Sequence, residues 1–103
     1  KLTSLTLPVS PSIKDLSPLG NLTNLRELRL YGRGDYYEQT FTDITPLGNL
    51  TNLQSLDIYY TRGLTDISPL RNLTNLQEVT ISTNDDAITD TSPVAHVPSV
   101  DIR

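Results

Sequence analysis

The chain has 103 residues, a formal net charge of -4 and a hydrophobic content of 36%, whereas globular domains usually have roughly 45–50% apolar residues. This length allows one domain at most, and the acidic balance disfavours binding to nucleic-acid phosphates or to anionic membranes. The chain lacks Cys, which excludes disulfides, thiolate zinc sites and cysteine nucleophiles, and no apolar run approaches the roughly 18 residues of a membrane span.

A single phrase organises the chain from its start to its end. Residues 15–25, 43–53 and 66–76 all read Asp-[Leu/Ile]-[Ser/Thr]-Pro-Leu-x-Asn-Leu-Thr-Asn-Leu, and residues 90–100 keep a decayed copy. Each copy leads into the spacing L-x-x-L-x-L, which also opens the chain at Leu2, Leu5 and Leu7. Such self-similarity is the signature of a repeat protein. We therefore expect one domain over residues 1–103 with about four repeats, excised from a larger protein.

The elements follow from the spacing of the apolar residues. The last two apolar residues of each L-x-x-L-x-L lie two positions apart, the period of a strand with one buried face. This predicts strands near residues 3–7, 26–30, 54–58 and 77–81, and a partial fifth at residues 100–102. Each Ser/Thr-Pro pair is typical of a helix cap followed by proline at the first helical position; the pairs are Ser17-Pro18, Thr45-Pro46, Ser68-Pro69 and Ser92-Pro93. The predicted fold is a right-handed α/β solenoid, with a parallel β-sheet on the concave face and short helical or 3-10 turns on the convex face.

One aspartate recurs in every repeat, and its residues are Asp15, Asp43, Asp66 and Asp90. Their combined charge equals the formal net charge of -4. We predict that these carboxylates accept backbone N–H bonds near each outer turn. An apolar residue two positions earlier completes the predicted core, at Ile13, Phe41, Leu64 and Ile88. The acidity of the chain therefore says little about its partner.

The repeated phrase resembles the repeat, about 22 residues long, of bacterial internalins, which are surface proteins that bind host proteins through a curved repeat domain. The likeness covers the whole chain. It implies a leucine-rich repeat fold, an extracellular or cell-surface location, adhesion and a protein partner such as a host-cell surface protein, while a cytoplasmic location stays open. One family feature is weak: the laddering Asn after the last strand leucine is replaced by Ser10, Arg33 and Thr61, and kept only as Asn84.

Repeat length varies along the chain. Measured between the first leucines of successive spacings and ending at Val100, the repeats have 23, 28, 23 and 24 residues. The longest contains residues 33–40, which we expect to project from the rim of the sheet. Insertions confined to one edge of a solenoid often mark the binding face.

The five tyrosines gather on or beside this rim. Two outward columns are predicted there, one of Pro8, Tyr31, Tyr59 and Ser82 and the last of Val9, Gly32, Tyr60 and Thr83. The other two, which include Ser4, Glu27, Ser55 and Glu78, carry a milder signal. Tyr beside Arg is typical of protein-binding hot spots, although Tyr also packs well on any β surface. The predicted partner-binding residues are Tyr31, Tyr36, Tyr37, Tyr59, Tyr60, Arg29, Arg33, Asp57 and Arg62.

Several shorter motifs have ordinary explanations. Arg33-Gly34-Asp35 spells the tripeptide that integrins recognise, but a Gly-Asp pair is also common in turns. The glycosylation sequons at Asn21, Asn49 and Asn72 belong to the repeat phrase. Oxygen ligands gather at Asn84, Asp85, Asp86 and Asp90, but they lack the alternating pattern and the glycine of a calcium loop. His96 stands where other repeats have Asn, without a catalytic partner in its register.

These observations favour a non-catalytic protein-recognition module. We predict no catalytic residue, no metal site and no cofactor, and neither nucleic-acid binding nor membrane insertion. The alternatives are a structural spacer in a multidomain surface protein and a carbohydrate-binding surface. Because the chain starts and stops on strands, we also expect self-association through uncapped ends.

Overall fold

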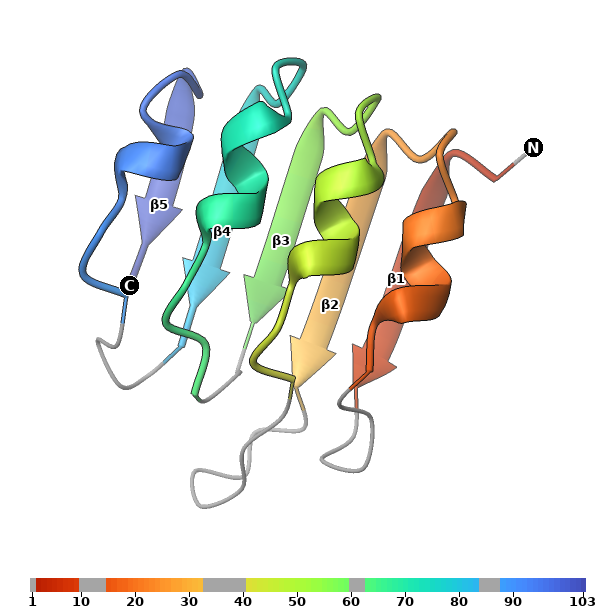
Figure 1. Cartoon of the computed structure of the whole chain (residues 1–103), viewed down its shortest axis with the longest axis horizontal. Coiled ribbons are helices and arrows are strands. Elements are labelled where there is room, and N and C mark those ends of the chain that lie inside the picture. Colours follow the sequence, from red (N-terminus) through yellow and green to blue (C-terminus); the bar gives the residue numbers. More distant parts are fainter. Residues whose placement is uncertain (1, 10–14, 33–40, 60–62, 84–87) are drawn as a thin grey trace.

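A computed structural model describes residues 2–9, 15–32, 41–59, 63–83 and 88–103. Five strands alternate with four short 3-10 helices, and all four helices lie on the same side of the sheet (Figure 1). The strands are β1 (Ser4–Val9), β2 (Glu27–Gly32), β3 (Ser55–Tyr59), β4 (Glu78–Ser82) and β5 (Ser99–Ile102). The helices are η1 (Ser17–Asn21), η2 (Thr45–Asn49), η3 (Ser68–Asn72) and η4 (Ser92–Val94). The first four strands begin one residue later than the sequence predicts, and β5 begins one residue earlier.

The sheet is parallel throughout, in the order β1-β2-β3-β4-β5. Equivalent residues of successive repeats are register partners, so Leu28 pairs with Leu56 and Leu56 pairs with Val79. This register holds between β2 and β3 although the chain connecting them is the longest. The predicted solenoid architecture, a parallel sheet with short outer turns, is confirmed.

The core lies between the sheet and the helices. Strand alternation places Leu56 and Ile58 inward, and both are buried, while the alternate residues Ser55, Asp57 and Tyr59 are half-buried. The predicted column before each aspartate is buried at Phe41 and Leu64 and partly buried at Ile88, and Ile13 lies outside the described residues. Each turn thus contributes one apolar stripe, which explains how a chain of low hydrophobic content forms a core.

The outer turns begin differently from the prediction. We expected the Ser/Thr side chain to cap each helix, but Ser17 is the first residue of η1, and Leu16 before it makes no side-chain cap hydrogen bond. The Asp15 carboxylate instead accepts the backbone N–H of Ser17 at 2.9 Å. An aspartate that binds the backbone two residues later forms an Asx-turn. It thereby satisfies a donor that the first turn of a helix leaves without a partner.

The last turn is shorter than the sequence alignment predicts. We aligned Val100 with Leu76, but the register pairs Val100 with Val79 and Ile102 with Ile81. Val100 lies three positions after Val97, whereas Val79 lies six positions after the equivalent Leu73, so the last turn is three residues shorter. Val97 donates its N–H to the Val94 carbonyl at 3.0 Å, so the helical part keeps its pattern and the shortening comes after it.

The two end strands leave the inward face partly open. Leu2, just before β1, is 47% exposed and Val100 of β5 is 41% exposed, whereas their equivalents in the third repeat, Leu53 and Leu56, are fully buried. Pro8 lies inside β1, where its missing N–H could interrupt the ladder. The Thr3 carbonyl accepts from Glu27 N at 3.1 Å, and because successive peptide groups alternate in direction, Pro8 N points to the unpaired edge of β1. The proline therefore costs no hydrogen bond to β2.

Candidate functional site

The face of the sheet opposite the helices, called the open face below, carries three columns of outward side chains. Neighbouring members of a column lie on adjacent strands, roughly 4.8 Å apart. The columns are Ser4, Glu27, Ser55, Glu78 and Ser99; then Thr6, Arg29, Asp57, Thr80 and Asp101; then Pro8, Tyr31, Tyr59 and Ser82. Each side chain on this face therefore has defined neighbours on both sides.

Tyr31 and Tyr59 form a stacked pair in the third column. Their ring centroids are 5.4 Å apart and their planes differ by 13°. Both rings are half-buried. Stacked aromatic pairs contribute about 0.5–1.5 kcal/mol beyond the area that they bury, so each ring holds the other in position. The pair presents a fixed aromatic surface with two hydroxyl groups.

Arg29 and Asp57 form an ion pair in the adjacent column, with 3.1 Å between Arg29 Nε and Asp57 Oδ2. The two side chains differ in exposure, 55% for Arg29 and 13% for Asp57. Hydrogen bonding to Tyr31 raises the pKa of the Arg29 guanidinium above its ordinary value, and the charge of Asp57 acts in the same direction. Arg29 therefore links the ion pair to the tyrosine pair.

These four residues, Arg29, Tyr31, Asp57 and Tyr59, are called the open-face cluster. β2 and β3 supply two each, because outward positions recur every second residue and the register aligns them across the strands. The cluster holds an aromatic surface, a guanidinium and a carboxylate side by side. It can offer apolar area together with hydrogen-bond donors and acceptors, the combination found at protein-binding hot spots.

The structure brings together four of the nine predicted site residues. Arg33, Tyr36, Tyr37, Tyr60 and Arg62 lie outside the described residues. The gathering of all five tyrosines at one rim therefore stays a prediction.

One predicted outward position is wrong. Thr83 was assigned to the last outward column, but it is buried with 1% exposure. Its backbone N–H donates to the Arg103 carbonyl at 3.2 Å. Strand alternation explains the difference, because Thr83 lies two residues after the inward Ile81 and shares its direction.

Sequence reasoning gave little weight to Glu27 and Glu78. Both are exposed on the first column of the open face, on either side of Ser55. Neither forms an ion pair with any other described residue. The predicted outward columns already contain both residues. The absence of a basic residue from their column was the sequence signal that their charges would stay unpaired within it.

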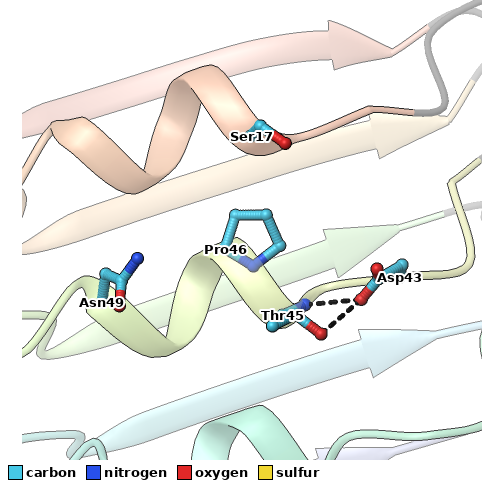
Figure 2. A pocket seen from close by; sticks show the side chains of 5 residues that line it. All are labelled: Ser17, Asp43, Thr45, Pro46 and Asn49. Atoms are coloured by element: carbon cyan, nitrogen blue, oxygen red, sulfur yellow. Dashed lines mark hydrogen bonds between the residues drawn. The ribbon is translucent and has the colours of Figure 1, made fainter.

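The opposite side of the molecule carries the aspartate column. Asp15, Asp43 and Asp66 each accept the backbone N–H two residues later at 2.9 Å, and Asp90 does so at 3.0 Å. Figure 2 shows Asp43 bonded to both the backbone and the hydroxyl of Thr45, beside a surface hollow of about 340 Å³ between η1 and η2. The predicted structural role of these carboxylates is confirmed. Three of its lining residues, Ser17, Asp43 and Thr45, are already used in bonds of this kind, and Pro46 and Asn49 of η2 complete the lining.

Polar side chains also join successive turns. Asn52 Nδ2 donates to the Thr23 carbonyl at 3.0 Å, and Asn75 Nδ2 donates to the Thr51 carbonyl at 2.9 Å. The Nε2 atom of His96 lies 2.9 Å from the Leu73 carbonyl oxygen. In these turns the bonding asparagines thus lie before the strand, and Asn84, which alone keeps the family's asparagine after the strand, lies outside the described residues.

The described part of the chain holds no group of three or more His, Asp and Glu side chains that could bind a metal ion. None of the helices in the described ranges has the length and apolar character needed to span a membrane.

The comparisons with known proteins agree with this architecture. A family model described as leucine rich repeats, in two copies, matches residues 51–96, and no curated protein matches the chain. Internalin C2 from Listeria monocytogenes is 36% identical with a TM-score of 0.69, and the match covers 88% of this chain and 38% of that protein. Internalin F from the same organism is 36% identical with a TM-score of 0.75, and the match covers 98% of this chain and 28% of that protein.

The chain is thus a leucine-rich repeat protein. Its repeats are of the bacterial internalin type, as the repeated phrase indicated. It spans less than half the length of either solved relative. A protein-interaction repeat module is the function class that these similarities support.

Proposed function

We propose that the chain binds a protein partner, without catalysis, through the open-face cluster of Arg29, Tyr31, Asp57 and Tyr59. The observation that carries this proposal is the stacked Tyr31–Tyr59 pair beside the Arg29–Asp57 ion pair. We expect the predicted rim residues, which lie outside the described residues, to extend the same site; they are Tyr36, Tyr37, Tyr60, Arg33 and Arg62. By similarity to internalins, the partner is a host-cell surface protein and the chain lies at the bacterial cell surface.

Physical reasons favour recognition over a spacer role. A spacer needs only outward side chains that keep the sheet soluble, and half-buried tyrosines are an inefficient choice for that purpose. Tyr buries a large area at a small loss of side-chain entropy and retains a polar end. Because Tyr31 and Tyr59 are already held by stacking, binding immobilises them at little further cost.

A carbohydrate partner is the alternative, since aromatic rings also stack against sugars. In the Tyr31–Tyr59 pair, however, each ring directs one face toward the other. This leaves less ring face for a sugar, and it favours a protein partner that contacts ring edges, hydroxyl groups and the neighbouring Arg29. Binding on a glycan array that depends on both tyrosines would favour the carbohydrate alternative.

The proposal is tested with a displayed random peptide library selected against the wild-type chain. We expect the selected peptides to lose about tenfold or more in affinity when Tyr31→Ser and Tyr59→Ser are combined, because both anchors of the aromatic surface are removed. The matched control combines Asn21→Ser and Asn72→Ser, two exposed positions on the helices. Circular dichroism shows whether each variant folds. Equal binding by the folded tyrosine variant and the wild type would refute the site.

A further inference from the structure

The charges of the open face are unevenly distributed. In the second column, Arg29 is paired with Asp57, and Asp101 is paired with Arg103, which follows it by two residues. In the first column, Glu27 and Glu78 have no basic partner among the described residues. The two glutamates therefore give the open face a negative charge near the first residues of its strands, and no described side chain neutralises that charge by an ion pair.

The space between the glutamates suits a cation. Glu27 lies on β2 and Glu78 on β4, so two strand spacings, roughly 10 Å in all, separate their backbones. The residue between them is Ser55, whose short side chain is half-buried and fills little of this gap. An ammonium or guanidinium group above Ser55 can approach both carboxylates.

The glutamates and the tyrosines also lie at a fixed distance along the strand. Tyr31 lies four positions after Glu27 on β2, which corresponds to roughly 13 Å in an extended strand. Arg29 lies between them and would repel a cation, but it is already engaged by Asp57 and Tyr31. The open face thus has an acidic end and an aromatic end.

We propose that the open face binds an extended basic segment of a protein partner. In this segment a Lys or Arg side chain lies between Glu27 and Glu78, and an apolar or aromatic side chain four positions away contacts Tyr31 and Tyr59. The spacing follows because an extended peptide rises by the same length per residue as the strands beneath it. This inference rests on the proposed function, which requires only that the open-face cluster bind a protein, and adds the chemistry of the partner.

The test uses the peptides selected from the random library against the wild-type chain. We expect most of them to carry Lys or Arg four positions from an aromatic or aliphatic residue, and to bind more weakly as salt is raised. A synthetic peptide of this kind is then titrated calorimetrically into the wild type and into the combined Glu27→Gln and Glu78→Gln variant. Affinity should fall about tenfold in the variant, whose substitutions preserve side-chain shape.

The control combines Asn21→Lys and Asn72→Lys on the helices, which changes the formal net charge by the same two units away from the open face. Equal weakening in the control and in the glutamine variant would show general attraction to an acidic chain and overturn the inference. Selected peptides that lack basic residues but depend on Tyr31 and Tyr59 would overturn it while leaving the proposed function intact. Peptides that depend on neither the glutamates nor the tyrosines would refute both.

Discussion

On the outer side of the molecule, one aspartate in each repeat binds the start of its own helical turn; these residues are Asp15, Asp43, Asp66 and Asp90. Hydrogen bonds from Ser17 lower the pKa of Asp15, and the bond from the Ser17 hydroxyl has a larger effect than the bond from its backbone N–H. In Asp66 the backbone N–H of Ser68 has the largest lowering effect on the pKa, while the charges of Asp43 and Asp90 act in the opposite direction. Each carboxylate is thus stabilised by its own turn, and Asp43 and Asp66 are in addition repelled by neighbouring aspartates.

Acid should weaken the fold through these carboxylates. Because their pKa values are lowered on folding, their contribution to stability is present above the ordinary value of 3.8 and is lost as the pH falls through the folded-state value. Urea unfolding midpoints measured from about pH 5 to pH 2.5 should fall steeply for the wild type and less steeply for Asp43→Asn. Parallel pH profiles for the two proteins would contradict this assignment.

At the scale of the element, each turn is a strand followed by a 3-10 helix, and polar side chains join one turn to the next. Asn52 and Asn75 occupy the same repeat position and bind the carbonyl of the preceding turn. Asn24 occupies this position in the first turn, and no described turn precedes it. The same residue therefore has a bonding partner in two turns, while no such bond is described for the first.

This difference permits a matched comparison. Asn75→Ala should lower the free energy of unfolding by about 0.5–1 kcal/mol, because an exposed hydrogen bond between turns is lost. Asn24→Ala removes the same side chain without removing such a bond, and its effect should be smaller. Urea denaturation of both variants measures the difference. An equal loss of stability in the two variants would contradict a specific role for the ladder.

The elements also show which features the sequence could predict. Strands, proline-containing turns and the carboxylate role follow from repeated spacing, because each copy obeys the same local chemistry. The shortened last turn was missed because residues 90–100 keep the phrase, whereas the register places Ile102, which packs against the core, beside Ile81. The outward position predicted for Thr83 is wrong because strand alternation gives Thr83 the same inward direction as Ile81, two residues before it.

The candidate site was predictable only where strand register fixes it. Arg29 and Asp57 are neighbours because β2 and β3 align, and the same alignment stacks Tyr31 on Tyr59. Glu27 and Glu78 could not be recognised as unpaired charges from their residue type alone. Which charges form ion pairs among the described residues depends on side-chain geometry, which the sequence does not give.

At the scale of the whole molecule, the fold is a stack whose interior turns are better covered than its ends. Leu2 and Val100, near opposite ends of the stack, are the large hydrophobic side chains that remain most exposed in the described structure. Unpaired strand edges adjoin both of them. Such edges favour association with another chain.

We expect reversible head-to-tail association of this chain, in which β5 of one copy lies beside β1 of the next. Sedimentation velocity should show an average mass that rises with concentration, and Val100→Lys should reduce this rise by placing a charge at the seam. Thr80→Lys, in the middle of the open face, is the control for added charge. A wild-type chain that stays monomeric at every concentration would contradict the expectation.

The constant register between β2 and β3 has a consequence for how such a surface can change. The connection between these strands is longer than the others, yet Arg29 still faces Asp57 and Tyr31 still faces Tyr59. Each side chain on the open face therefore has a fixed position in the sheet, set by its strand and by its place within the strand. Loop length does not alter that position. Evolution or protein design can therefore substitute one side chain, or exchange one loop, and the neighbours of the new side chain follow from the strand register.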